Sequence, residues 1–189
     1  MPIAIASAIE ERYQTFWPRF WAGWIDAAIW LPLLAVDSWI EEHIHSPIFL
    51  ASWFIAYTLS FDFYSVAMHS KYGQTLGKMA MGVKVLDVTE KKLSLRQALL
   101  RDCVPIMFSV LIIFDDLSTV LAGRSRSDNT ELDWVLIMAA YGYMLWFAAE
   151  LVTMLFSSKR RALHDFIASS VVVRTRTASV SPQSDARAG

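Results

Sequence analysis

The sequence predicts an all-α membrane protein with four transmembrane helices, plus a small β-hairpin and an interfacial helix in the cytoplasmic loop between helices two and three. Apolar side chains make up 55% of the 189 residues, more than in typical soluble domains. Four apolar segments also approach the roughly 20 residues that a helix needs to cross a hydrocarbon core. These predicted spans cover residues 20–40, 47–68, 103–122 and 134–156.

The N-terminal segment, residues 1–18, is expected to lie along the cytoplasmic membrane surface. It mixes apolar residues with Glu10, Glu11 and Arg12, a composition that suits a short helix in the headgroup layer. No basic region precedes the first span and no small-residue cleavage site follows it, so we expect a retained span rather than a signal peptide. The transmembrane domain then covers residues 19–173.

The loop of residues 69–102 is too polar to cross a membrane, and it has its own pattern. The stretch "GVKVLDV" alternates like a strand, "TEKK" resembles a turn, and "LSL" resembles a short return strand. Ser94 then precedes "LRQALLRD" as a helix cap, with Leu95, Ala98 and Leu99 on one face. The later stretch "SSVVVRTR" is a further strand candidate that can pair with the hairpin. Residues 174–189 are small and polar and are predicted to be a disordered cytoplasmic tail.

The basic residues predict the orientation in the membrane. Of the 17 Lys and Arg residues, fifteen lie in the two terminal segments and the 69–102 loop. The loop 41–46 has none, and the loop 123–133 has only Arg124 and Arg126. The positive-inside rule therefore places both termini in the cytoplasm. We expect a multi-pass protein of the cell (inner) membrane. Its basic clusters are expected to bind an anionic lipid leaflet rather than nucleic acid.

Several motifs exclude other functions. Cys103 is the single cysteine, which rules out an internal disulfide or a zinc site built on several thiolates. Gly73 and Gly77 are separated by three residues instead of four, and Met79 follows Lys78, so the loop does not match a nucleotide-binding P-loop. A tight glycine turn is the better interpretation. We expect no metal site and no cofactor.

Enzyme activity is also not expected. His164 and Asp165 are adjacent, but no further His or Cys lies at metal-ligand spacing. No nucleophile with a neighbouring base is visible. The favoured interpretation of this pair is a capping and hydrogen-bonding role at the cytoplasmic end of the last span.

Acidic residues inside the spans are the strongest functional signal, because ionisable groups there are rare and are candidates for function. With a rise of 1.5 Å per residue, Asp26, Asp62 and Glu150 all lie about 6 to 8 Å to the cytoplasmic side of their span centres. Asp115 and Asp116 lie slightly beyond the centre of the third span and extend a polar track. All five are candidates for binding protons or transported ions.

Arg19 alone does not stabilise Asp26. The two residues are two helical turns apart, so their attraction across about 10 Å is roughly 1.6 kcal/mol at an effective dielectric near 20. Insertion scales put the cost of a central Asp at about 2.5 to 3.5 kcal/mol. Another partner, water or protonation must supply the difference.

Three motifs together resemble the RDD family of membrane proteins. Arg19 and Asp26 match its first helix, and "GQTLGKMAMGVKVLD" is similar to its loop segment. "RRALHDFIASSVVV" is similar to its closing segment. The matching positions in the loop are Gly73, Gln74, Thr75, Gly77 and Lys78, and those in the closing segment are Arg161, His164 and Asp165. The resemblance implies a multi-span protein with a suspected transport role, in some members exchange of monovalent cations and protons.

Two hypotheses follow. In the first, the chain is a small secondary transporter or cation/proton exchanger, aided by assembly into a homo-oligomer, in which Asp26 alternates between proton and cation. In the second, it is a non-transporting scaffold or accessory subunit that docks a partner through its cytoplasmic loop. Asp26, Asp62 and Glu150 facing one another across a polar cavity favour exchange, whereas carboxylates held by separate packing partners favour the scaffold.

Overall fold

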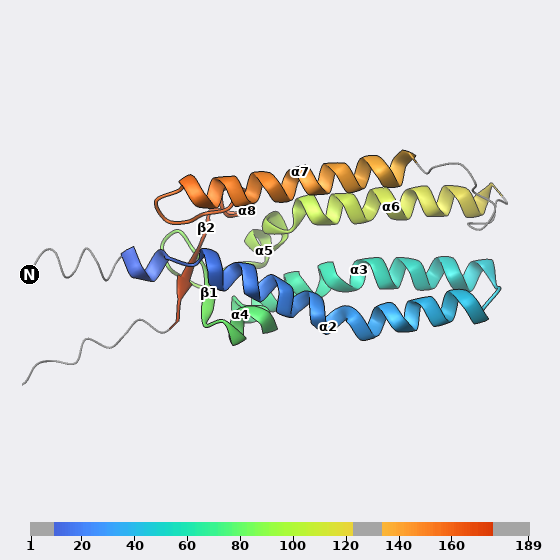
Figure 1. Ribbon diagram of the computed structural model, residues 1–189, viewed down its shortest axis with the longest axis horizontal. Helices are drawn as coiled ribbons and strands as arrows, with labels where there is room; N and C mark the ends of the chain where they lie inside the picture. Colours follow the sequence, from blue (N-terminus) through green and yellow to red (C-terminus); the bar gives the residue numbers. More distant parts are fainter. Residues whose placement is uncertain (1–9, 123–133, 176–189) are drawn as a thin grey trace, which may run out of the picture.

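Two pairs of long helices form the body of the molecule in the computed structural model, which describes residues 10–122 and 134–175 (Figure 1). One pair consists of α2 and α3 and the other of α6 and α7, all running along the longest axis of the molecule. Contacts between α3 and α6 join the two pairs. The bounds of the long helices are α2 (Phe16–His43), α3 (Pro47–Tyr72), α6 (Cys103–Leu121) and α7 (Trp134–Phe156).

Five short elements gather at one end of the long helices, which we call the sheet end (Figure 1). These elements are α4 (Leu76–Ala80), β1 (Val83–Asp87), α5 (Leu95–Arg101), α8 (Leu163–Ile167) and β2 (Ser170–Arg174). A further short helical stretch covers residues 10–13. The predicted interfacial segment is therefore described from residue 10 onward, and the predicted tail beyond residue 175 lies outside the described residues.

Among residues 10–122 and 134–175, three helical segments have the length and apolar composition to cross a membrane: Glu10–His43, which includes α2, and the helices α6 and α7. The predicted second span, α3, is long enough at 26 residues, but it is not among them. Hydroxyl and charged side chains such as Ser60, Asp62 and Tyr64 interrupt its apolar run. The fourth crossing therefore stays a prediction, although α3 runs back beside α2 along the same axis in Figure 1.

The long helices bury little of their apolar surface against one another. Many large side chains point outward, including Phe63, Phe114, Leu121 and Leu145, each more than 70% exposed. Such an apolar exterior is expected where lipid chains replace water as the solvent. The compact packing is instead concentrated at the sheet end.

The predicted β-hairpin is wrong, whereas the predicted pairing with the late strand is confirmed. Strand β1 pairs antiparallel with β2, from Val83 opposite Arg174 to Asp87 opposite Ser170. The predicted return strand does not form, because Ser94 and Gln97 exchange hydrogen bonds in a capping box that begins α5. The helix predicted after Ser94 is therefore confirmed.

A small apolar core lies at the sheet end. It consists of buried residues from β1, the segment before α5, α5 itself and β2, with Val66 of α3 and Met81 packed against it. The buried members are Val83, Val85, Leu93, Ala98 and Val172. This core attaches the sheet to the long helices and so positions the polar side chains described next.

Candidate functional site

Asp165 is the centre of a buried ion-pair cluster at the sheet end. Its carboxylate accepts a hydrogen bond from Arg19 Nη1 of α2 at 2.7 Å and a short one from Arg101 Nη1 at the end of α5. The backbone N–H of Ala162 donates to the same carboxylate at 2.8 Å, which satisfies an N–H at the start of α8. Asp165 thus joins three elements that are distant in the sequence.

Asp165 is held in its ionised form by its neighbours. Burial by itself raises the pKa of this carboxyl, but the positive charges of Arg101 and Arg19 lower the pKa more, to well below its usual range. Two guanidinium groups face this one buried carboxylate, and Glu150 also attracts Arg19 electrostatically. Removing Asp165 would leave two unpaired cations there, an arrangement that typically destabilises a fold by several kcal/mol.

His164 connects this cluster to α7. Its Nε2 lies 3.1 Å from Arg19 Nη2. Arginine can only donate, so Nε2 accepts, and Nδ1 then donates to Glu150 in a short hydrogen bond. Burial first, and then the charge of Arg101, lower the pKa of His164, in keeping with a neutral ring. Glu150, a predicted ion-binding residue, is thus a partner of His164.

Asp26 is bound by the loop that follows α3. Its carboxylate accepts hydrogen bonds from Thr75 Oγ1 at 2.6 Å, from the backbone N–H of Gly77 at 2.8 Å and from the hydroxyl of Tyr64 at 2.9 Å. The Tyr64 hydroxyl in turn accepts from the Leu76 N–H at 2.8 Å. The predicted additional partner of Asp26 is therefore α4 and its N-terminal cap, which we call the loop latch (residues 73–80).

Glycine is required at position 77 by the close contact between α4 and α2. A Cβ atom at this position would lie 2.1 Å from the carbonyl oxygen of Ala22 and 2.9 Å from Cγ of Asp26. The predicted glycine turn is instead at Gly73, which ends α3 in the left-handed conformation at φ 70°. Gln74 Nε2 completes the latch by donating to the Val83 carbonyl at 2.9 Å.

A second polar cluster, absent from our sequence predictions, lies beside the latch. Lys78 Nζ is 2.6 Å from His69 Nε2. The Ser65 hydroxyl is 3.2 Å from His69 Nδ1 and 2.9 Å from a carboxylate oxygen of Asp102. His69 is buried at 2% exposure. The sequence offered a signal in Lys78, which belongs to a motif, and in His69, which directly follows a predicted span. The two are nine positions apart, however, and only the fold shows that their side chains meet.

Asp62 differs from the other carboxylates that the sequence placed within predicted spans. It is 7% exposed, and the Ser109 side chain of α6 is its hydrogen-bond partner. Its second oxygen, Oδ2, is buried without a partner in the described part of the chain. A buried carboxylate oxygen without a donor is costly unless it takes up a proton, a cation or water.

The three acids predicted at one depth therefore have separate partners. Asp26 bonds the latch, Asp62 bonds Ser109 and Glu150 bonds His164. On α6, Asp116 is buried and Asp115 is partly buried. Among residues 10–122 and 134–175, no three His, Cys, Asp or Glu side chains converge as a metal site would require.

The last motif residue, Arg161, contacts the backbone of α8 and of β2. Its Nε donates to the Ser170 carbonyl at 3.0 Å and its Nη2 to the Asp165 carbonyl at 2.9 Å. Asp165 does act as a capping residue, but it caps the start of α8 through its bond to Ala162 and not the end of the last predicted span. All three sequence motifs thus meet at the sheet end.

Comparison with known proteins identifies a family. The RDD family model matches residues 13–169, which include the first two motifs and the three matching positions of the closing segment, Arg161, His164 and Asp165. No curated protein and no solved structure matches the chain.

Proposed function

Because the chain belongs to the RDD family, we propose that it is a small membrane exchanger that moves protons against a monovalent cation, with Asp62 as its ion-binding carboxylate. The single observation that carries this proposal is the buried, unpartnered Oδ2 of Asp62. In hydrocarbon surroundings a proton or a cation on this oxygen compensates the carboxylate charge, and exchange of one for the other is the elementary step.

Asp26, which the sequence favoured for this role, suits a structural role better. Its two oxygens already receive three donors from the latch and from Tyr64. Binding a cation at Asp26 would require several of these bonds to break. Asp62 has a free acceptor without any such rearrangement, and Ser109 provides a neighbouring hydroxyl oxygen.

The proposed arrangement has the sheet end in the cytoplasm, four crossings and more than one copy. The basic residues around the sheet end support the orientation. The short connection between α2 and α3, residues 44–46, supports α3 as a crossing antiparallel to α2. A second copy is included because two helix pairs that bury little surface against each other leave little room for an enclosed pathway.

Flux measurements test the exchanger. Purified protein is reconstituted into sealed liposomes that contain a pH-sensitive dye, and a Na⁺ or K⁺ gradient is imposed. We expect proton movement with the wild type, none with Asp62→Asn, and residual movement with Asp62→Glu, which keeps the carboxylate. Asp26→Asn serves as the matched control, because it should unfold at lower temperature yet retain flux per folded molecule.

Two results would contradict this proposal. One is the absence of proton movement by the wild type in well-sealed vesicles with either cation. The other is unchanged flux in Asp62→Asn, which would exclude that carboxylate from the pathway.

A scaffold function is the second candidate, favoured by the separate partners of the three carboxylates and by the firmly held latch. The latch presents Leu76 and Met79 outward, at 45% and 39% exposure. If these side chains dock a partner protein, Gly77→Ala should release it, because α4 cannot keep its place. Recovery of the same partners with wild type and with Gly77→Ala would contradict the scaffold.

A further inference from the structure

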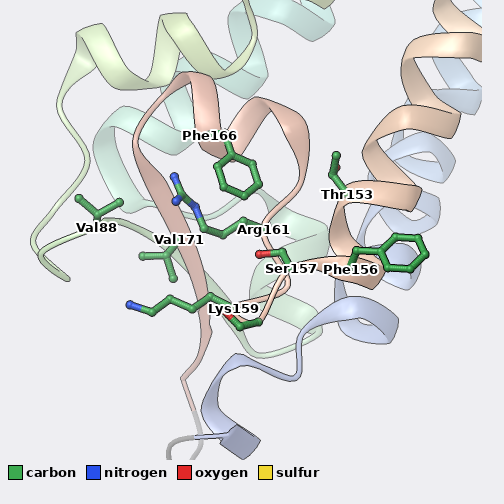
Figure 2. A pocket seen from close by; sticks show the side chains of 9 residues that line it. Val88, Thr153, Phe156, Ser157, Lys159, Arg161, Phe166 and Val171 are labelled. Atoms are coloured by element: carbon green, nitrogen blue, oxygen red, sulfur yellow. The ribbon is translucent and has the colours of Figure 1, made fainter.

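A cavity of about 650 Å³ lies at the sheet end where α7 passes into α8 and β2 (Figure 2). Its size is within the range of pockets that hold small ligands. Two of its nine lining residues are basic, Lys159 and Arg161, and none is acidic. Three hydroxyl side chains also line it, those of Thr153, Ser157 and Ser158. The cavity therefore offers positive charge and hydrogen-bond donors together.

Arg161 is held in place but keeps donors available. Its two hydrogen bonds to backbone carbonyls leave three of its five N–H groups. The guanidinium also lies over the Phe166 ring, 4.1 Å from the ring centroid. The described residues provide no carboxylate for it. A fixed guanidinium of this kind is well suited to binding phosphate oxygens.

Lys159 is the second cation without an acidic partner in the described residues. Its Nζ lies 5.3 Å from the centroid of the Tyr13 ring, and the residue is exposed. The adjacent cavity of about 580 Å³ shares Lys159 with this one but includes Glu10. The charge balance therefore favours an anion in the first cavity.

The apolar surroundings indicate that the anion carries acyl chains. Phe156 at the end of α7 is 86% exposed, and Val152 and Leu155 on the same helix are each about half exposed. In Figure 2, the Phe156 ring lies at the end of α7 and points away from the Arg161 and Lys159 side chains, which extend toward β2. A charged hollow next to a lipid-facing helix matches the shape of a phospholipid at the membrane surface.

We propose that this cavity binds the phosphodiester headgroup of an anionic phospholipid through Lys159 and Arg161, while an acyl chain lies along α7. The site is independent of Asp62 and of the exchange function. It differs from diffuse attraction to an anionic leaflet because particular side chains form it.

The test is lipid binding by the purified full chain in detergent, followed by native mass spectrometry and by thermal unfolding. Phosphatidylglycerol, phosphatidylcholine and inorganic phosphate are added in separate series. We expect phosphatidylglycerol to bind and to raise the unfolding temperature, with neither effect from phosphate alone. Lys159→Gln should lower the preference for phosphatidylglycerol over phosphatidylcholine about fivefold, since one cation at a membrane surface contributes about this factor.

Lys92→Gln is the matched control, because it removes the same charge from an exposed loop position at the same end of the molecule. It should leave the lipid preference unchanged. Arg161→Gln should have a larger effect, and Lys159→Gln alone decides the question if the Arg161 variant does not fold. Equal binding of the two lipids, displacement of the lipid by inorganic phosphate, or an equal loss in Lys92→Gln would each overturn the proposal.

Discussion

At the scale of single residues, the most unusual group is the Lys78 ammonium. Its partial burial lowers the pKa of Lys78 to about 7, and the positive charges of Arg101 and Arg19 add to this shift. The opposing attractions of Asp102 and Asp26 are weaker. Near neutral pH, Lys78 therefore gains and loses a proton next to His69 and next to the residues that bind Asp26.

This shift predicts a pH-dependent stability. Between about pH 7 and pH 10.5, the unfolded chain holds a proton on Lys78 that the folded protein has released, so the free energy of unfolding rises with pH across this window. The wild type should gain about 1 to 2 kcal/mol between pH 7.5 and 9.5 relative to Lys78→Met, since the limit is about 1.4 kcal/mol per pH unit. Thermal unfolding in detergent at both pH values measures this gain.

Lys92→Met controls for the loss of a lysine elsewhere, and its pH dependence should follow that of the wild type. Parallel curves for wild type and Lys78→Met would mean that Lys78 has an ordinary lysine pKa.

At the scale of elements, we expect the position of α4 to be highly sensitive to the addition of a single methyl group. Gly77→Ala places a methyl group within 2.1 Å of the Ala22 carbonyl oxygen, so α4 must move and the bond from Gly77 N–H to Asp26 must lengthen. Overpacking of this kind costs about 1 to 3 kcal/mol. We expect trypsin to cut after Lys78 and Lys84 much faster in Gly77→Ala than in the wild type.

Gly23→Ala is the matched control on α2, because a Cβ atom there meets nothing within 4 Å. Its cleavage rate should equal that of the wild type. Equal rates for all three proteins would show that the latch does not depend on this contact.

The sequence predicted the elements better than their partners. Ser94 and the periodicity after it were enough to place α5, because capping is local. The partner of β1 was less certain, since residues 83–87 and 170–174 pair across most of the chain and only the completed fold fixes their register. Likewise, Arg19 and Asp165 are 146 positions apart, so their spacing carries no sign of the ion pair.

In the candidate site, too, local features were predictable from the sequence and distant partners were not. The depth of Asp62 in α3 was predictable from helix geometry, but its unpartnered oxygen depends on how α3 packs against α6. His69 and Asp102 were not predicted, because each is an ordinary polar residue until the fold brings them together with Lys78.

At the scale of the whole molecule, the path of α3 decides the membrane topology. Four crossings place residues 44–46 outside and the loop between α3 and α6 inside. In a Cys103→Ser background, His45→Cys should react in intact cells with a maleimide that cannot enter them, whereas Lys91→Cys should react only after lysis. Reaction of both or of neither cysteine in intact cells would contradict four crossings with this orientation.

The pairing of β1 with β2 also determines when, during synthesis, the sheet end can fold. Both β2 and Asp165 follow α7, so ribosomes must synthesise every long helix before Arg19, Arg101 and β1 can reach their partners. Chains fold from their N-terminus as they emerge. Arg19 and Arg101, which are buried in the folded protein, therefore have no carboxylate partner until synthesis is almost finished. A protein interrupted before residue 165 lacks the carboxylate that pairs with Arg19 and Arg101, so these two unpaired cations mark an unfinished molecule.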